Sequence, residues 1–506
     1  MSSRRTLATG FSLFLLFTLA GCAGTRPDPS TGLEWGAAAT IIERALDNPQ
    51  HAHSVWGVHV VDLSTGATLL QRNEGLNLVP ASNAKLYTTA AALDLLGPNF
   101  VFETVVDTPG RVENDTLFGP LFVRGSGDPT IGGRFNGGDE LEIFRRWAAE
   151  LRARGIRHIQ GDIVGDDNAF DDTPLGYGWS WDDEPYWYSA EISALSFNDN
   201  CVDVSVNAGA PGEPGTVDWE PLRTSYVTIT NKTETVPHDS LAEEKYRRKR
   251  ATNHIVVESR LAVGSTETES LSISNPTAFF VYVLRDVLEQ EGITVDGYAL
   301  DIDDIETTLV LPTTTELIRH RSRPLAEIVA VVNKRSQNLY ADQLLKTLGA
   351  FLPADEADEP GGSAENGLAL AAKVWVRAGI DTSLAQVVDG SGLSRYNLVS
   401  ATMTTQLLAY MWSRPDSIRS AFYDSLPIGG VDGTLSGRYD DGPARGLVHA
   451  KTGSVSNVSS LSGYVTMRDG TPMAFSLMCN NFVVDTDDIR AVQDLIVGTL
   501  ASLRGL

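Results

Sequence analysis

Cysteine and basic residues are both scarce in this chain of 506 residues. Cysteine occurs only at positions 22, 201 and 479, and 40 Lys and Arg are outnumbered by 65 Asp and Glu, for a formal net charge of −25. A surface this acidic repels nucleic acid and anionic lipid headgroups, so we expect neither as a direct partner. The eight histidines show no spacing typical of metal ligands, and we predict no metal site.

Long apolar runs are missing as well, with one exception near the start of the chain. Residues 11–20 are mostly apolar, follow Arg4 and Arg5, and precede a group of small residues. This order is typical of a secretory signal, and the run is too short for a comfortable membrane span. We therefore predict a signal peptide over residues 1–21 and an exported protein whose charge, without the two arginines, is about −27.

The last residues of this segment, Leu19-Ala20-Gly21-Cys22, resemble the lipobox of bacterial lipoproteins. The resemblance implies that Cys22 is acylated and that residues 22–34 tether the protein to a membrane, facing the periplasm. Ala23 after the cysteine favours the outer membrane. An ordinary cleaved signal with an incidental cysteine is the alternative.

Only Cys201 and Cys479 then remain in the folded part of the chain. Cys479 lies in the apolar, strand-like segment MAFSLMCNNF, where a buried thiol is the simplest interpretation. A bridge between the two cysteines stays open, and the oligomeric state is not visible in the sequence.

The two ends of the chain share a pattern of paired strands and a helix that the middle of the chain lacks. A predicted helix at residues 35–46 and a hairpin with its turn at 64–66 precede a further helix, while two adjacent strands and a helix end the chain. The chain is too long for one core, and its middle is rich in short strands and Gly-containing turns. We therefore predict an insertion within one main part. The expected boundaries are residues 35–103 and 301–506 for the main part, 104–176 and 275–300 for a second part, and 177–274 for a third.

A serine and a lysine stand at the start of the predicted helix after the hairpin. Ser82 and Lys85 lie three residues apart, so the hydroxyl and the amine can touch on one helix face. A hydroxyl beside an amine is a nucleophile with its base, provided that burial, the helix terminus and a second lysine keep the amine neutral. The pattern alone is weak, because Ser is a common N-cap and Lys a common surface residue.

Two further motifs follow in the second half of the chain. Ser336 and Asn338 form an SxN pattern between two predicted helices, a setting that the matches at 196–198 and 205–207 lack. The triplet KTG at residues 451–453 occurs once, between two strand-like segments. A lysine and a threonine there can bind a carboxylate, and a glycine leaves room for a substrate backbone beside the strand.

The ordered set SxxK, SxN and KTG is that of the penicillin-recognising serine enzymes. With a long insertion between the first two motifs, the chain resembles peptidase family S13, the DD-peptidases that include penicillin-binding protein 4. The stretches GDIVGDDNAF, YSAEISALSFNDNCVDVSVNAG, DGSGLSRYNLVSA and VHAKTGSVSNVSSLSGYV carry the resemblance from about residue 40 onward. It implies an α/β fold, a penicillin-binding/β-lactamase-like transpeptidase domain with an antiparallel sheet flanked by helices, and a large nested, mainly-β insertion.

The resemblance implies a serine D-Ala-D-Ala carboxypeptidase or endopeptidase that needs no cofactor. It would cleave D-Ala-D-Ala termini or D-Ala-diaminopimelate crosslinks of peptidoglycan stem peptides through an acyl-enzyme, and β-lactams would inhibit it. A β-lactamase or esterase on the same scaffold is one alternative, and a non-catalytic wall-binding lipoprotein is another. The balance between the two peptidase activities is not readable from the sequence, because both substrates carry a carboxylate next to the scissile bond.

The family's functional roles can be carried over onto the matching residues. Ser82 would be the nucleophile and Lys85 its base, although the acylation base is disputed in related enzymes. Ser336 would relay a proton, and Asn338 would hold Lys85 and the substrate. The carboxylate site would consist of Lys451 and Thr452 beside Gly453, and the oxyanion hole of the N–H groups of Ser82 and Ser454.

The aromatic stretch YGWSWDDEPYWY lies in the predicted insertion. The resemblance implies that Trp179, Asp182 and Trp187 surround the ammonium group of a diamino acid by carboxylate pairing and cation–π contact. Val455 stands where family members often carry Met, which puts the shape of this subsite in doubt. A packed anchor at a domain junction is the alternative interpretation of the stretch.

Overall fold

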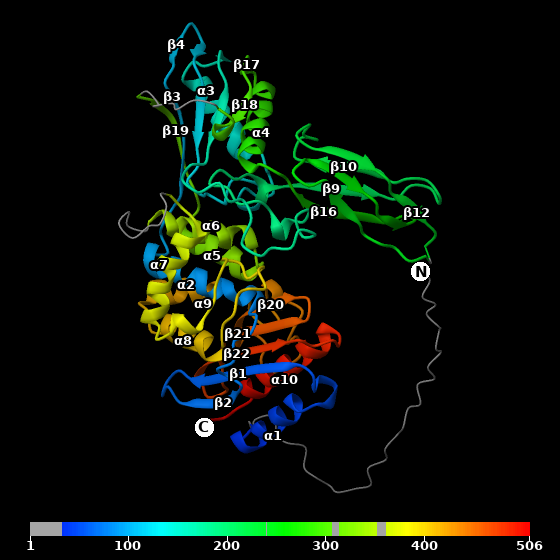
Figure 1. Cartoon of the computed structure of the whole chain (residues 1–506), viewed down its shortest axis with the longest axis vertical. Helices are drawn as coiled ribbons and strands as arrows, with labels where there is room; N and C mark the ends of the chain where they lie inside the picture. Colours follow the sequence, from blue (N-terminus) through cyan, green and yellow to red (C-terminus); the bar gives the residue numbers. More distant parts are fainter. Residues whose placement is uncertain (1–32, 239, 306–312, 352–360, 506) are drawn as a thin grey trace.

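The structure is a computed structural model that describes residues 33–238, 240–305, 313–351 and 361–505. The predicted signal peptide, Cys22 and most of the predicted tether lie outside the described residues. Within the described ranges, no helix has the length and hydropathy needed to cross a membrane. Figure 1 shows a helix-rich part that contains both ends of the described chain and a mainly β part beside it.

A five-stranded antiparallel sheet with the order β2-β1-β22-β21-β20 forms the centre of the helix-rich part. Its strands are β1 (Val55–Asp62), β2 (Thr68–Arg72), β20 (Val448–Val455), β21 (Val458–Thr466) and β22 (Pro472–Asn480). The predicted hairpin with its turn at residues 64–66 is confirmed as β1 and β2. Strand β1 also pairs with β22 along its whole length, so segments from both ends of the chain share one sheet.

The prediction of two adjacent strands near the end of the chain is wrong, because the structure has three. Asn457 has a φ of 62° and closes a tight turn between β20 and β21. Gly470, with a φ of 91°, belongs to the turn between β21 and β22. The run of residues 448–480 is therefore a three-stranded meander, and it places the KTG triplet on the edge strand β20.

Helices cover both faces of this sheet. Alternate residues of β22 point to opposite sides: Phe475 and Leu477 pack with α1 and α10, while Ala474 and Met478 pack on the side of α8. The predicted helix at residues 35–46 is confirmed as α1. The helices of this part are α1 (Trp35–Leu46), α2 (Ala84–Leu96), α5 (Leu325–Lys334), α6 (Asn338–Ala350), α7 (Ala364–Arg377), α8 (Ala401–Trp412), α9 (Asp416–Ser425) and α10 (Thr486–Ala501).

The second part has its own sheets and two helices. Two sheets have the orders β18-β8-β6-β3-β19 and β17-β7-β5-β4. The elements are β3 (Glu103–Thr108), β4 (Arg111–Glu113), β5 (Thr116–Phe118), β6 (Leu121–Arg124), α3 (Glu142–Ala153), β7 (His158–Ile159), β8 (Ile163–Asp166), α4 (Pro276–Gln290), β17 (Thr294–Val295), β18 (Ala299–Asp301) and β19 (Thr315–Arg321). Because β19 pairs with β3, residues 315–321 lie with the insertion and not with the helix-rich part.

Small sheets make up the third part. They have the orders β10-β9-β16, β11-β14-β13 and β12-β15. The strands are β9 (Cys201–Asn207), β10 (Thr216–Glu220), β11 (Thr228–Asn231), β12 (Glu234–Val236), β13 (Tyr246–Arg248), β14 (His254–Val257), β15 (Arg260–Ala262) and β16 (Thr266–Ser272). One apolar cluster of residues between 106 and 318 joins the second and third parts, so the insertion has a core of its own.

Both described cysteines are free and buried. Cys201 begins β9 in the insertion, and Cys479 lies in β22 of the central sheet. Burial raises the pKa of Cys479 to about 12 and also raises that of Cys201. The interpretation of Cys479 as a buried core thiol is confirmed.

Candidate active site

Three distant segments of the chain meet at the edge of the central sheet. Ser82 lies in a single 3-10 turn, Ala81–Asn83, that leads directly into α2, which also carries Lys85. Ser336 lies between α5 and α6, and its φ of 60° reverses the chain so that α6 begins at Asn338. The edge strand β20 brings Lys451, whose Nζ lies 2.9 Å from Ser336 Oγ. The structure thus brings the three predicted motifs together.

The amine of Lys85 is fully buried and has three oxygen neighbours. Its Nζ lies 2.9 Å from Ser82 Oγ, 2.6 Å from Asn338 Oδ1 and 2.6 Å from the carbonyl oxygen of Ser391. The Asn338 amide donates from Nδ2 to the carbonyl of Tyr188 at 2.6 Å, which turns its oxygen toward the lysine. Two of the three neighbours can therefore only accept. A neutral amine has two N–H groups for these two acceptors, and its lone pair is left for the Ser82 hydroxyl.

Burial decides the charge state of both lysines. It lowers the pKa of Lys85, while the carboxylates of Asp342 and Asp389 act in the opposite direction. The pKa of Lys451 is lowered well below its usual range, by burial first and by Lys85 second. Two lysines without accessible surface thus disfavour each other's positive charge, and this is the condition under which a lysine acts as a base.

A buried aspartate shapes the loop that contacts Lys85. Asp389 accepts from the backbone N–H groups of Gly392 and Ser394, both at 2.7 Å, and from Asn397 Nδ2 at 2.8 Å. Gly392 has a φ of 82°, and a Cβ atom there would lie 1.9 Å from the carbonyl oxygen of Ala81. The loop is therefore fixed against the Ser82 turn, which holds the Ser391 carbonyl on the lysine amine.

The glycine of the KTG triplet sets the distance between β20 and the Ser82 turn. A Cβ atom on Gly453 would lie 2.6 Å from the Pro80 carbonyl oxygen and 3.1 Å from the backbone nitrogens of Ser82 and Asn83. The edge strand can approach this closely only because the side chain is absent. The close approach brings the strand residues Thr452 and Ser454 beside Ser82, where all three line one cleft.

Two clefts extend from Ser82 and Ser336 in different directions. One has a volume of about 610 Å³ and runs past Thr452 toward α10. The other has a volume of about 360 Å³ and is bordered by Trp187 of the insertion and Val455 of β20. A substrate that bridges the two would present its scissile bond between Ser82 and Ser336.

The three residues predicted for the insertion subsite have separate positions. Trp187 borders the smaller cleft. Trp179 does not border it, because its indole nitrogen donates to Asp389 at 2.9 Å, a contact that fits the alternative of an anchor between parts. Asp182 is exposed and accepts from Ser180, and its neighbour Asp183 borders the cleft instead and accepts from the Tyr188 hydroxyl at 3.1 Å.

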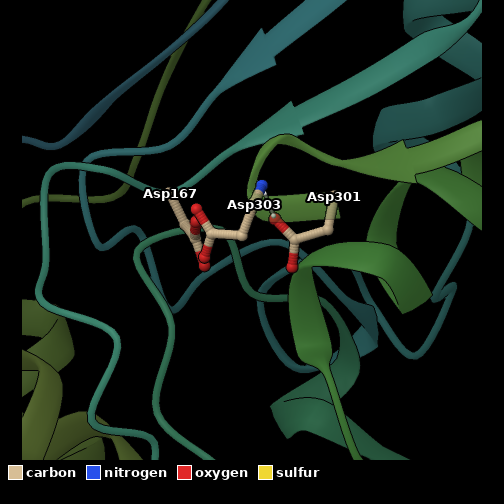
Figure 2. Close-up of side chains that lie close together, drawn as sticks. All are labelled: Asp167, Asp301 and Asp303. Carbon is tan, nitrogen blue, oxygen red and sulfur yellow. Dashed lines mark hydrogen bonds between the residues drawn. The ribbon is translucent and has the colours of Figure 1, made fainter. Parts of the chain in front are cut away.

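One acidic cluster in the insertion has the geometry of a cation site. Carboxylate oxygens of Asp167, Asp301 and Asp303 all lie within 4.8 Å of one another (Figure 2). The Asp167 carboxylate accepts from the hydroxyls of Ser193 and Thr277, and Asp301 accepts from the backbone of Asp303. These hydrogen bonds hold the Asp167 and Asp301 carboxylates in place, and we assign no metal to the cluster.

Several residues of the site were not identified from the sequence. Asp342 accepts from the Gly390 backbone at 2.6 Å, and Asp199 of the insertion accepts from Gln337 Nε2 at 3.0 Å and from the Tyr340 hydroxyl at 2.8 Å. Gln337 is the middle residue of the SxN motif, so Asp199 of the insertion fixes the position of that motif. Asp199 and Asp389 lie in stretches that carry the family resemblance, but nothing in their spacing indicates what they contact.

The three motifs of the penicillin-recognising serine enzymes are SxxK, SxN and KTG. Here they meet through the contacts of Lys85 with Ser82 and Asn338 and of Lys451 with Ser336. The D-Ala-D-Ala carboxypeptidase 3 (S13) family matches residues 37–503, and the chain belongs to this family. The predicted family resemblance and the predicted fold class are both confirmed. The chain is therefore a peptidoglycan DD-peptidase of the D-Ala-D-Ala carboxypeptidase type.

Individual relatives cover most of the chain. A D-alanyl-D-alanine carboxypeptidase of Actinomadura sp. (strain R39) is 34% identical over 99% of this chain and 91% of its own length. The D-alanyl-D-alanine carboxypeptidase DacB of Haemophilus influenzae is 28% identical over 82% of both chains. The crystal structure of penicillin binding protein 4 from Haemophilus influenzae superposes with a TM-score of 0.77 at 26% identity, over 92% of this chain and 98% of that one.

Replacing Gly453 tests the close approach of β20. In Gly453→Ala the new Cβ meets backbone atoms that cannot rotate away, so the strand must shift from the Ser82 turn. We expect hydrolysis of a D-Ala-D-Ala peptide to fall at least tenfold, together with a lower Tm. Gly498→Ala in α10 is the control, because no atom lies within 4 Å of its Cβ position. Full activity in Gly453→Ala would contradict the packing argument.

The acidic cluster makes stability depend on pH. Burial, and then Asp167, raise the pKa of Asp301 to about 6. Because the folded state favours the protonated form, the cost of ionised Asp301 is present above about pH 6 and absent below its unfolded pKa of about 4. We expect Asp301→Asn to raise the Tm by about 1–3 °C at pH 7.5 and to have little effect at pH 4. The prediction fails if calorimetry gives the same change at both pH values, and exposed Asp303→Asn should give a smaller gain.

Proposed function

We propose that the chain hydrolyses D-Ala-D-Ala termini and D-Ala-diaminopimelate crosslinks of peptidoglycan through an acyl-enzyme on Ser82. The contact of 2.9 Å between Ser82 Oγ and the buried Lys85 amine carries this proposal. Neutral Lys85 takes the hydroxyl proton as Oγ bonds to the D-Ala carbonyl carbon. The C–N bond then breaks, and the proton that Lys85 took is passed through Ser336 to the leaving nitrogen, which leaves Lys85 neutral again. Water hydrolyses the ester in the second half-reaction and returns the proton to Ser82.

The substrate's terminal carboxylate belongs on the β20 side of this centre. Lys451 Nζ already donates to Ser336 Oγ and to the Thr452 carbonyl, at 2.9 and 2.8 Å. A carboxylate beside Lys451 and the Thr452 hydroxyl supplies the negative charge that the buried ammonium group lacks. The N–H groups of Ser82 and Ser454 serve as the oxyanion hole, a contribution of ~3–4 kcal/mol per donor.

The smaller cleft fits the side chain of the diamino acid that precedes the cleaved D-Ala unit. Asp183 offers a carboxylate and Trp187 a ring face, so together they suit an ammonium group. We assign this role to Asp183 in place of Asp182, and we keep Trp187. Val455 borders the same cleft and leaves it wider than a longer side chain would.

β-Lactams fit the same centre as covalent inhibitors that acylate Ser82. The Haemophilus influenzae relative is named for penicillin binding, and it has also been solved as a complex with a β-lactam. Export to the periplasm and acylation of Cys22 complete the proposal, since the substrate lies in the cell envelope. Mass spectrometry of the mature protein from its membrane fraction, with Cys22→Ser as the control, tests the lipid anchor.

Removing the nucleophile tests the assignment of Ser82. We expect Ser82→Ala to lose more than a thousandfold in kcat/KM on purified muropeptides, and to lose covalent labelling by a fluorescent penicillin. Ser336→Ala should keep the label but acquire it more slowly. Unchanged hydrolysis by Ser82→Ala would reject the nucleophile, and rapid loss of the label from the native protein would favour a β-lactamase.

The charge near Lys85 sets the pH at which the enzyme becomes active. The Asp342 carboxylate raises the pKa of Lys85 against the effect of burial, so neutralising it lowers that pKa. More of the lysine is then neutral at low pH. Burial raises the pKa of Asp342 itself to about 7, so only part of its charge is present on the acidic limb. We expect Asp342→Asn to move that limb of the penicillin acylation rate toward lower pH by less than about 1 pH unit. Asp301→Asn is the control, because Asp301 lies in the insertion and does not shift Lys85; movement of the limb to higher pH would contradict the assignment.

A further inference from the structure

The larger of the two clefts is too large for a leaving alanine. It begins at Ser82 and Thr452, where the scissile bond and the carboxylate are proposed to lie, and it continues to Asp487, Arg490 and Ala491 of α10. Its volume of about 610 Å³ is within the range of pockets that hold drug-sized ligands, about 300–1,000 Å³. A single D-Ala, whose side chain is a methyl group, occupies only the end next to Thr452.

A crosslink places a larger group at the same position. Its leaving residue keeps the amide nitrogen and the neighbouring carboxylate, but the methyl group is replaced by the aliphatic chain of the diamino acid. That chain leads to a second stem peptide with carboxylates of its own. If the first carboxylate is bound at Thr452, the second peptide must leave along the cleft that starts there.

We propose that the α10 cleft, defined as the part of this cleft bordered by Gly437, Arg438, Arg490 and Ala491, binds the second stem peptide of a cross-linked substrate. The inference rests on the proposed function of Ser82. It assigns one class of ligand to this surface, an anionic peptide attached to the leaving amine. The residues around the scissile bond offer no binding surface for such a peptide.

The two arginines of the α10 cleft differ in how firmly they are held. Arg438 makes three hydrogen bonds of 2.6, 2.9 and 3.2 Å to the Asp494 carboxylate, and its side chain is only 14% exposed, so it is a fixed part of the cleft lining. Arg490 pairs with Asp487 one helical turn away at 2.9 Å, with side-chain exposures of 45% and 87%. An exposed pair of this kind contributes little to stability, which leaves the Arg490 guanidinium free to turn to a substrate carboxylate.

The other large cavity does not compete for this role. It has a volume of about 990 Å³ and lies between the insertion and the catalytic part, bordered by Arg134, Asp199 and Gln337. Neither Ser82 nor Ser336 borders it. Trp187 borders both this cavity and the smaller cleft, and Thr434 borders both this cavity and the larger cleft. The cavity adjoins both clefts but reaches neither serine of the proposed centre, so it is not the direct path of the group on the leaving nitrogen.

Comparing two substrates tests the α10 cleft. Ala491 is exposed and lines it, so Ala491→Trp places a bulky ring in the path of the leaving strand. The full chain is assayed on a muropeptide monomer that ends in D-Ala-D-Ala and on a D-Ala-diaminopimelate crosslinked dimer, with products quantified by mass spectrometry. We expect Ala491→Trp to lower kcat/KM for the dimer at least tenfold more than for the monomer. For Arg490→Ala we expect a dimer-selective loss of about threefold to tenfold, mainly through a higher KM.

The chain offers matched controls for both variants. Arg419 pairs with Asp416 on α9 at the same spacing, with side-chain exposures of 39% and 88%, so Arg419→Ala removes an equivalent pair outside the cleft. Ala37→Trp places the same ring on an exposed position of α1. Both should leave the ratio of dimer to monomer hydrolysis unchanged. Penicillin labelling reports the nucleophile separately, because opening of the lactam ring releases no second peptide.

Each outcome has one meaning. Selective loss on the dimer in Ala491→Trp and Arg490→Ala supports the α10 cleft. Equal losses on both substrates, or no loss on the dimer, overturn it, as does a native protein that cleaves the monomer but not the dimer. A native protein that cleaves neither substrate and takes up no penicillin rejects the proposed function itself, and the inference with it.

Discussion

The proposed catalytic centre depends on the burial of one amine, that of Lys85. An exposed lysine beside a serine stays protonated and cannot accept the hydroxyl proton. The structure removes the amine from water and gives it two acceptors that cannot donate, Asn338 Oδ1 and the Ser391 carbonyl. The helix α2, the loop after Asp389 and the start of α6 must all be in place for this arrangement. These three elements together keep the Lys85 amine buried and uncharged.

The insertion also contacts the residues that surround the Lys85 amine. The Tyr188 carbonyl turns the Asn338 amide, Asp199 holds the residue between Ser336 and Asn338, and Trp179 donates to Asp389. All three contacts come from residues 179–199, at the boundary between the inserted sheets and the catalytic part. Each fixes a group that itself fixes Lys85 or Ser336. The insertion is therefore part of the second layer around the active site, in addition to bordering its clefts.

The sequence was sufficient for the motifs and insufficient for their supports. Ser82, Lys85, Ser336, Asn338 and Lys451 could be found because their chemistry depends on residue type and order along the chain. Asp342 contacts Gly390 across 48 residues of sequence, Asp199 contacts Gln337 across 138, and Asp389 contacts Trp179 across 210. No periodicity in the sequence indicates contacts over such separations. The choice between Asp182 and Asp183 depended on the direction of one irregular turn, and the third strand of the final meander depended on a turn at Asn457.

The two buried lysines suggest why the substrate itself completes the electrostatics of the site. In the proposed mechanism, Lys85 is neutral to act as a base, whereas Lys451 is charged to hold a carboxylate. Without substrate, burial lowers the pKa of both amines, and Lys85 lowers that of Lys451 further, while Asp342 and Asp389 act against burial at Lys85. A bound carboxylate beside Lys451 raises the pKa of that lysine, and the resulting positive charge keeps the neighbouring Lys85 neutral. A peptide that lacks the terminal carboxylate would therefore lose more than a binding contact, because it would also leave the two amines without the charge that distinguishes their roles.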